Sequence, residues 1–147
     1  VGMNDTGVEA LSKNSSWVNL ETLVLGCEGS GSILGEGKNN IIGDEGAIAL
    51  SKNSAWINLK KLNLRYAKIG VEGATALGKN SSWSKLTTLH LEHNTVSAKG
   101  VTEICGNSSW TNLKLLLLDG NDIKDPEKDQ LIAQFPRIQL EFGKAIQ

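Results

Sequence analysis

The sequence is poor in several features that define other classes of protein. Its two cysteines, Cys27 and Cys105, are fewer than a secreted scaffold stapled by disulfides usually carries. With 15 basic and 16 acidic residues, the net charge of -1 provides neither a basic surface for nucleic acid nor a polybasic membrane patch. No apolar run approaches the roughly 18 residues of a spanning helix. These absences favour a reducing, cytoplasmic compartment and argue against nucleic-acid or membrane partners.

What the sequence does contain is an internal repeat. Trp17, Trp56, Trp83 and Trp110 each follow Asn-Ser-Ser or Asn-Ser-Ala, and the last three are 27 residues apart. The first interval is 39 residues, and its surplus of 12 falls in the Gly/Ser-rich stretch 27–39. We therefore interpret 1–147 as one domain with a partial repeat 1–16, repeats 17–55 (insertion 27–39), 56–82, 83–109 and 110–124, and a C-terminal cap 125–147.

Each period predicts a strand, a turn and a helix. The segment Trp56 to Leu64 reads Trp-x-x-Leu-x-x-Leu-x-Leu, and such alternation over five or six residues indicates a short strand with one buried face. A turn with an apolar anchor follows, as in Asn94-Thr95-Val96, and then a helical segment such as Gly46 to Leu50, whose small residues let neighbouring helices lie close. We expect N-caps at Asn4, Gly43, Gly70 and Ser97, and helix ends in left-handed Asn14, Asn53, Asn80 and Asn107.

One such unit cannot bury both its strand face and its helix face, so the units must stack into a solenoid. The framework LxxLxL, Asn-x-Ile and Gly-Ala-x-Ala-Leu resembles leucine-rich repeats of the ribonuclease-inhibitor type, and Gly-Ala-x-Ala-Leu is similar to the GALA subgroup of bacterial effectors. The resemblance covers nearly all of 1–124, although Tyr66-Ala67 replaces the usual turn asparagine. It implies an α/β fold: a curved right-handed solenoid with parallel strands on the concave face and helices on the convex face. For a secreted effector, the expected location is the cytoplasm of the host cell.

The two ends differ from the repeats. Residues 4–14 form a helical segment without its own strand, which predicts a fragment of a longer array with an open N-terminal end that could self-associate. Asp125-Pro126 starts a helix, and 137–142 alternates as a last edge strand. The tryptophans recur at one repeat position, which predicts a stacked core ladder of all four.

The strand register also predicts a binding surface. Side chains between the leucines point out of the concave face, where repeat solenoids bind proteins. Aromatic and arginine side chains gather at its centre, and these are the residues that protein interfaces favour. Ile33 and Leu34 of the insertion are expected to add a contact. The predicted partner-binding residues of the sheet are Lys61, Asn63, Arg65, Tyr66, Thr88, His90, Glu92, His93, Leu115, Leu117 and Asp119.

Other chemistries have weaker support in the sequence. His90, Glu92 and His93 could be the ligands of a metal-dependent hydrolase, but no third histidine exists and the turn decides the direction of His93. The glycines of 27–39 miss the spacing of phosphate and dinucleotide loops. Cys27 and Cys105 fall on different parts of the repeat, so a bridge between them is not expected. We therefore predict a protein-binding module with no catalytic residues, metal or cofactor.

Overall fold

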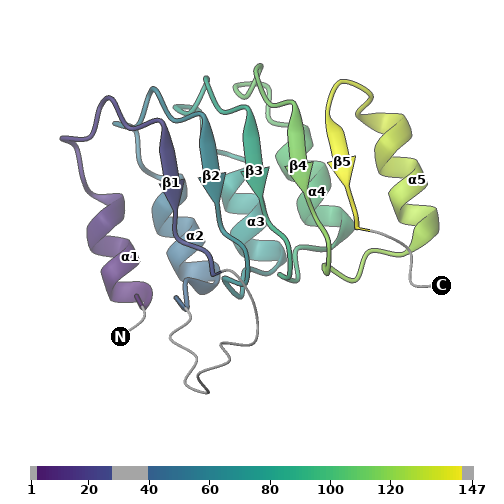
Figure 1. The fold of residues 1–147 in the computed structure, drawn as a ribbon, viewed down its shortest axis with the longest axis horizontal. Helices are drawn as coiled ribbons and strands as arrows, with labels where there is room; N and C mark the ends of the chain where they lie inside the picture. The colour runs from purple at the N-terminus through teal and green to yellow at the C-terminus, as the bar shows by residue number, and fades with distance from the viewer. Residues whose placement is uncertain (1–2, 28–39, 144–147) are drawn as a thin grey trace.

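The computed structural model describes residues 3–27 and 40–143, and in them helices and strands alternate along the chain. The order is α1 (Asp5–Ser12), β1 (Thr22–Val24), α2 (Gly43–Ser51), β2 (Lys61–Asn63), α3 (Val71–Leu77), β3 (Thr88–His90), α4 (Ser97–Cys105), β4 (Leu115–Leu117), α5 (Asp125–Gln134) and β5 (Gln139–Glu141). The strands lie side by side in one sheet in chain order, and helices cover one of its faces (Figure 1). This is the predicted α/β solenoid. In the described ranges no helix is long and apolar enough to span a membrane.

The strands are parallel, and the pairing of the central strands follows the 27-residue period of the sequence. Lys61 pairs with Thr88, and Asn63 pairs with His90. Each strand has three residues rather than five or six, because the backbone turns left-handed soon afterwards, with φ of 52° at Tyr66 and 56° at His93. The amide N–H of Tyr66 still donates to the carbonyl of Glu92 in the next repeat. The pairing of equivalent residues in neighbouring repeats therefore continues beyond the ends of the strands.

The core lies between the sheet and the helices. The central strand leucines are buried, and Trp83 stacks on Trp56 and on Trp110 with ring centroids 6.3 and 6.0 Å apart. The prediction that Trp17 belongs to this ladder is wrong, because its side chain is 45% exposed. Trp17 lies in the first described strand repeat, where a following repeat can cover only one side of the ring. The helices approach closely, since a Cβ atom at Gly100 would lie 2.8 Å from the Cβ of Ala74.

The helix starts match the prediction in part. Asn4 is the N-cap of α1, and its side chain accepts a hydrogen bond from the Gly7 N–H. Gly70 is the N-cap of α3. Gly43 and Ser97 are instead the first residues of α2 and α4, with φ of 63° and 57°. Glycine suits position 43 because it adopts a left-handed backbone without strain.

The predicted role of the asparagines at the helix ends is wrong. The C-caps are Lys13, Lys52, Gly78 and Gly106, all right-handed, and the asparagines follow them. Asn80 is buried, and its side-chain amide donates to the carbonyls of Ser51 and Asn53 in the preceding repeat. Its Oδ1 accepts from the N–H groups of Ser82 and Trp83. Asparagine is therefore used for its side-chain amide, which joins one repeat to the next.

Candidate binding surface on the concave face

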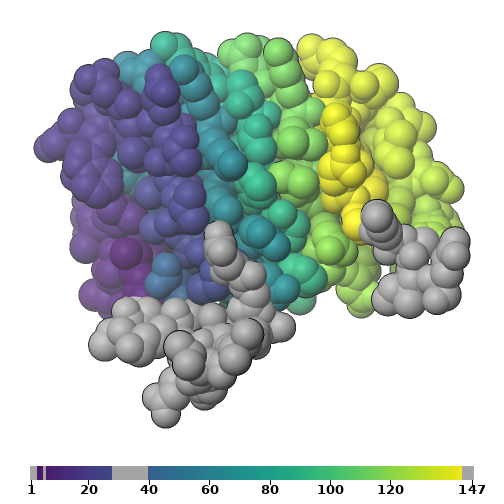
Figure 2. All heavy atoms as spheres, in the orientation of Figure 1, coloured from purple at the N-terminus to yellow at the C-terminus, as the bar shows by residue number. Residues whose placement is uncertain are grey.

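The concave face is the face of the sheet that carries no helix, and Figure 2 views the molecule in the orientation of Figure 1, with the strands in front. Residues that pair across neighbouring strands form rows on this face. One row runs through Lys61, Thr88 and Leu115, and a second runs through Asn63, His90 and Leu117. β5 extends them with Gln139 and Glu141.

A buried carboxylate lies at the centre of this surface. Glu92 is 8% exposed, and its Oε1 lies 3.2 Å from His90 Nδ1 and 3.5 Å from Arg65 Nε. Its Oε2 is buried and has no hydrogen-bond partner among the described residues. Burial of a charged group is unfavourable unless other groups compensate the charge. Arg65 and His90 therefore compensate one oxygen of this carboxylate and leave the other free.

Tyr66 and His93 form a second cluster. Their rings stack with centroids 4.2 Å apart and planes 9° apart. Both residues have left-handed backbone at the same repeat position, so the turn directs the two side chains in parallel. His93 Nε2 lies 3.8 Å from Asp119 Oδ2. His93 thus interacts with Tyr66 and Asp119, whereas His90 interacts with Glu92.

Because His90 and His93 have different partners, the structure does not support the predicted metal site of His90, Glu92 and His93. Over the residues placed by the structure, no group of three His, Cys, Asp or Glu could hold a metal ion. The ligand set imagined from His90, Glu92 and His93 is therefore not assembled. Cys27 and Cys105 are both free thiols.

A groove of about 350 Å³ opens on the concave face between β3 and the last two strands. Its lining combines apolar and charged side chains: Arg65, Glu92, Leu115, Leu117, Asp119, Gln139, Glu141 and Gly143. Five of these eight were predicted site residues. Gln139, Glu141 and Gly143 were not among the predicted residues, although extending the register to the edge strand 137–142 includes the first two. Lys61, Asn63 and Thr88 lie on the same face outside the groove, and Ile33 and Leu34 lie outside the described residues.

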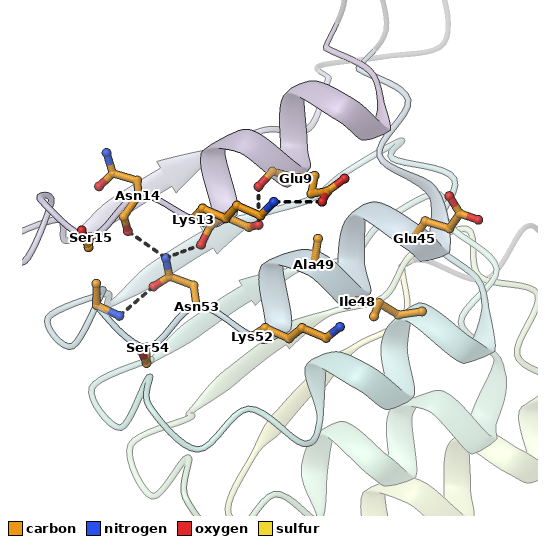
Figure 3. Close-up of a pocket in the computed structure, with 12 residues that line it drawn as sticks. Glu9, Lys13, Asn14, Ser15, Glu45, Ile48, Ala49, Lys52, Asn53 and Ser54 are labelled. Carbon is orange, nitrogen blue, oxygen red and sulfur yellow. Dashed lines mark hydrogen bonds and ion pairs between the residues drawn. The ribbon is translucent and has the colours of Figure 1, made fainter.

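A larger cavity, of about 520 Å³, lies between α1, α2 and the turns that follow them (Figure 3). Several of its polar groups bond to one another. Lys13 Nζ lies 3.1 Å from Glu9 Oε1, and the Asn53 amide donates to the carbonyls of Ser12 and Asn14. The Asn53 bonds join two repeats, so we assign this cavity to the scaffold.

The comparisons with known proteins agree with this architecture. The family model described as "Leucine Rich repeat" matches residues 37–51, 57–78 and 84–105. The fold is similar to leiomodin-1 actin-binding site 2, with 15% identity and a TM-score of 0.62 over 95% of this chain and 79% of that one. It is also similar to the tropomodulin C-terminal domain of Caenorhabditis elegans, with 10% identity and a TM-score of 0.62 over 96% of this chain and 83% of that one. Comparison with curated proteins finds no match.

Proposed function

Because the chain folds as a leucine-rich repeat solenoid, we propose that it binds a partner protein through its concave face. Solenoids of this kind commonly use that surface for recognition, since it is extended and free of helices. The proposed contacts are the predicted residues of the sheet, from Lys61 on β2 to Asp119 after β4, with Gln139 and Glu141 added by β5.

The observation that carries this proposal is the ordered centre of the surface. The stacked rings of Tyr66 and His93 stand next to Arg65, which is paired with Glu92. Aromatic and arginine side chains supply much of the energy in protein interfaces. A side chain already held in place loses less conformational entropy when a partner binds. This centre is therefore suited to anchor a ligand.

Two narrower assignments belong to the proposal. The Gly-Ala-x-Ala-Leu motif supports placement near the ribonuclease-inhibitor and GALA types, and with it the role of a bacterial effector or an intracellular regulator in the cytoplasm. The name of the leiomodin-1 segment makes actin the first defined partner to test. At 15% identity this likeness carries the fold, so actin is used as a probe.

The test is a double substitution at the centre of the surface. Arg65→Ala with Tyr66→Ala should weaken partner binding at least roughly tenfold, about 1.4 kcal/mol, with little change in melting temperature. Titration calorimetry with actin, and with proteins captured from lysate and then purified, provides the affinities. Lys99→Ala with Glu103→Ala, on the exposed face of α4, is the control. Loss of binding in the α4 pair alone would place the interface on the convex side.

Self-association is a second candidate, and one observation favours it. Trp17, Val18 and Ile57 are 45%, 44% and 51% exposed. Val18 and Ile57 occupy the same position in neighbouring repeats, and the Asn58 side chain donates to the Val18 carbonyl between them. Sedimentation at rising concentration tests this candidate: Val18→Lys with Ile57→Lys should abolish any dimer, and a monomer at every concentration in the parent protein would rule the candidate out.

A further inference from the structure

We propose that the groove between β3 and β5 receives a cationic side chain of the partner, arginine in preference to lysine. This inference rests on the proposed function and specifies the chemistry of the partner at that surface. It depends on three independent features of the groove: its charge, the free oxygen of Glu92 and its apolar wall.

The charge of the groove is acidic. Three carboxylates line it, those of Glu92, Asp119 and Glu141, against one cation, Arg65. His93 lies near Asp119, and Gln139 donates its side-chain amide to one oxygen of Glu141. Lys61 and Arg65 belong to the β2 side of the face, so the acidic groups gather toward β4 and β5. Such asymmetry favours a ligand whose positive group points toward the C-terminal strands.

The second feature is the unpartnered oxygen of Glu92. Glu92 lines the groove with a side chain that is 11% exposed, and its buried Oε2 has no hydrogen-bond donor in the described part of the chain. A buried acceptor without a donor lowers stability by about 1–3 kcal/mol, and more when it is charged. Because Oε2 is itself buried, a donor brought by a ligand would satisfy it once the carboxylate turns this oxygen toward the groove. Surface carboxylates do not have this property, which separates Glu92 from an ordinary acidic patch.

The third feature is the wall formed by Leu115 and Leu117 on β4. Both point out of the same face and line the groove, at half-buried positions. Long cationic side chains lay their methylene stems along apolar surface and keep the charge at the polar end. A planar guanidinium can also donate to two carboxylates at once, which an ammonium does less well. Arginine therefore fits this groove better than lysine.

The inference is tested with small probes of matched shape. Nα-acetyl-arginine amide is titrated into the whole labelled chain, and backbone amide signals of residues 115–119 are followed by NMR. Nα-acetyl-citrulline amide has nearly the same shape without the charge, and Nα-acetyl-lysine amide has the charge without the plane. We expect saturable shifts with the arginine probe, weaker binding of the lysine probe and no saturable shift with citrulline.

Variants locate the effect. Asp119→Asn with Glu141→Gln should weaken binding of the arginine probe at least about fivefold, since two of the three carboxylates lose their charge. Glu103→Gln on the exposed face of α4 is the control and should leave it unchanged. Glu92→Gln should weaken it as well. The double variant keeps the test decisive if loss of the Arg65 and His90 contacts unfolds Glu92→Gln.

Two results would overturn the groove assignment: equal shifts from the arginine and citrulline probes, or equal weakening by Glu103→Gln. A further comparison separates this inference from the proposed function. If the partner loses affinity in the Arg65→Ala, Tyr66→Ala protein but not in the carboxylate variant, the groove proposal fails and concave binding stands. If neither protein loses affinity for the partner, concave binding itself fails.

Discussion

Replacing Asn80 with alanine tests how the repeats are joined. The side chain makes two kinds of bond. Its amide donates to the carbonyls of Ser51 and Asn53 at 2.9 and 3.2 Å, and its Oδ1 accepts from the N–H groups of Ser82 and Trp83 at 3.0 and 2.9 Å. Its Oδ1 also accepts from the indole N–H of Trp110 at 3.4 Å, so alanine would leave four backbone groups and this N–H without the partner.

The magnitude follows from which groups water can reach. The bonds to Ser51 and Ser82 are partly buried, so water can replace them, whereas those to Asn53 and Trp83 are buried. An unsatisfied buried group lowers stability by about 1–3 kcal/mol, so the groups of Asn53 and Trp83 alone lower the free energy of unfolding of Asn80→Ala by about 2–6 kcal/mol.

Asn14 is the matched control. Its Oδ1 accepts from the N–H groups of Ser16 and Trp17 in the same turn geometry, but at exposed positions. Water can replace these bonds, so Asn14→Ala should lower the free energy of unfolding by under about 1 kcal/mol. Urea unfolding followed by circular dichroism measures both values, and equal slopes against urea confirm that the same surface unfolds.

A glycine variant separates the two explanations of the asparagine. If a left-handed backbone were the requirement, Asn80→Gly would retain most of the stability. If the side-chain amide is the requirement, glycine should be no better than alanine. Equal losses in Asn14→Ala and Asn80→Ala, or a stable Asn80→Gly, would refute the hydrogen-bond explanation.

Three further predictions concern the core, the site and a thiol. Leu89→Ala should lower the free energy of unfolding by about 2–5 kcal/mol, because this strand leucine is fully buried between repeats, and an unchanged urea midpoint would contradict its placement. Gly120→Ala should displace the His93 ring from Tyr66, since a Cβ atom at this left-handed position would overlap that ring, and unchanged His93 NMR signals would disprove the displacement. Burial raises the pKa of the Cys105 thiol to about 12, so at about pH 8 its alkylation should be at least roughly tenfold slower in the native protein than in urea; equal rates would show that the native thiol ionises freely.

The register could be predicted from the sequence because it depends on a short-range pattern. Leucines at fixed spacing must lie on the core side of every strand, and a repeat of 27 residues then pairs Lys61 with Thr88 and Thr88 with Leu115. The same reasoning assigns small residues such as Gly100 to the contact between helices. In both cases one period contains all the information that the prediction needs.

The failures concern residues whose role depends on a neighbouring repeat. Asn80 follows a helix end, where asparagine is often left-handed, and only the stacked structure places Ser51 and Asn53 within reach of its amide. Trp17 has the same local sequence as Trp83 but lacks a covering repeat on one side in the described chain, so identical motifs give an exposed ring and a buried one. Local sequence does not distinguish these environments.

The local sequence also could not predict the environment of Glu92 in the candidate site. Alternation places Glu92 on the face of His90, but it assigns the same direction to a solvated carboxylate and to a buried one. Burial of Glu92 and its contact with Arg65 across 27 residues arise only when two repeats are stacked. His90 bonds one carboxylate oxygen and Arg65 lies near it, while Oε2 has no hydrogen-bond donor among the described residues. Apolar residues that replace a buried ion pair often leave the stability unchanged or raise it. The incomplete bonding of Glu92 is therefore the strongest reason to expect that a ligand completes it.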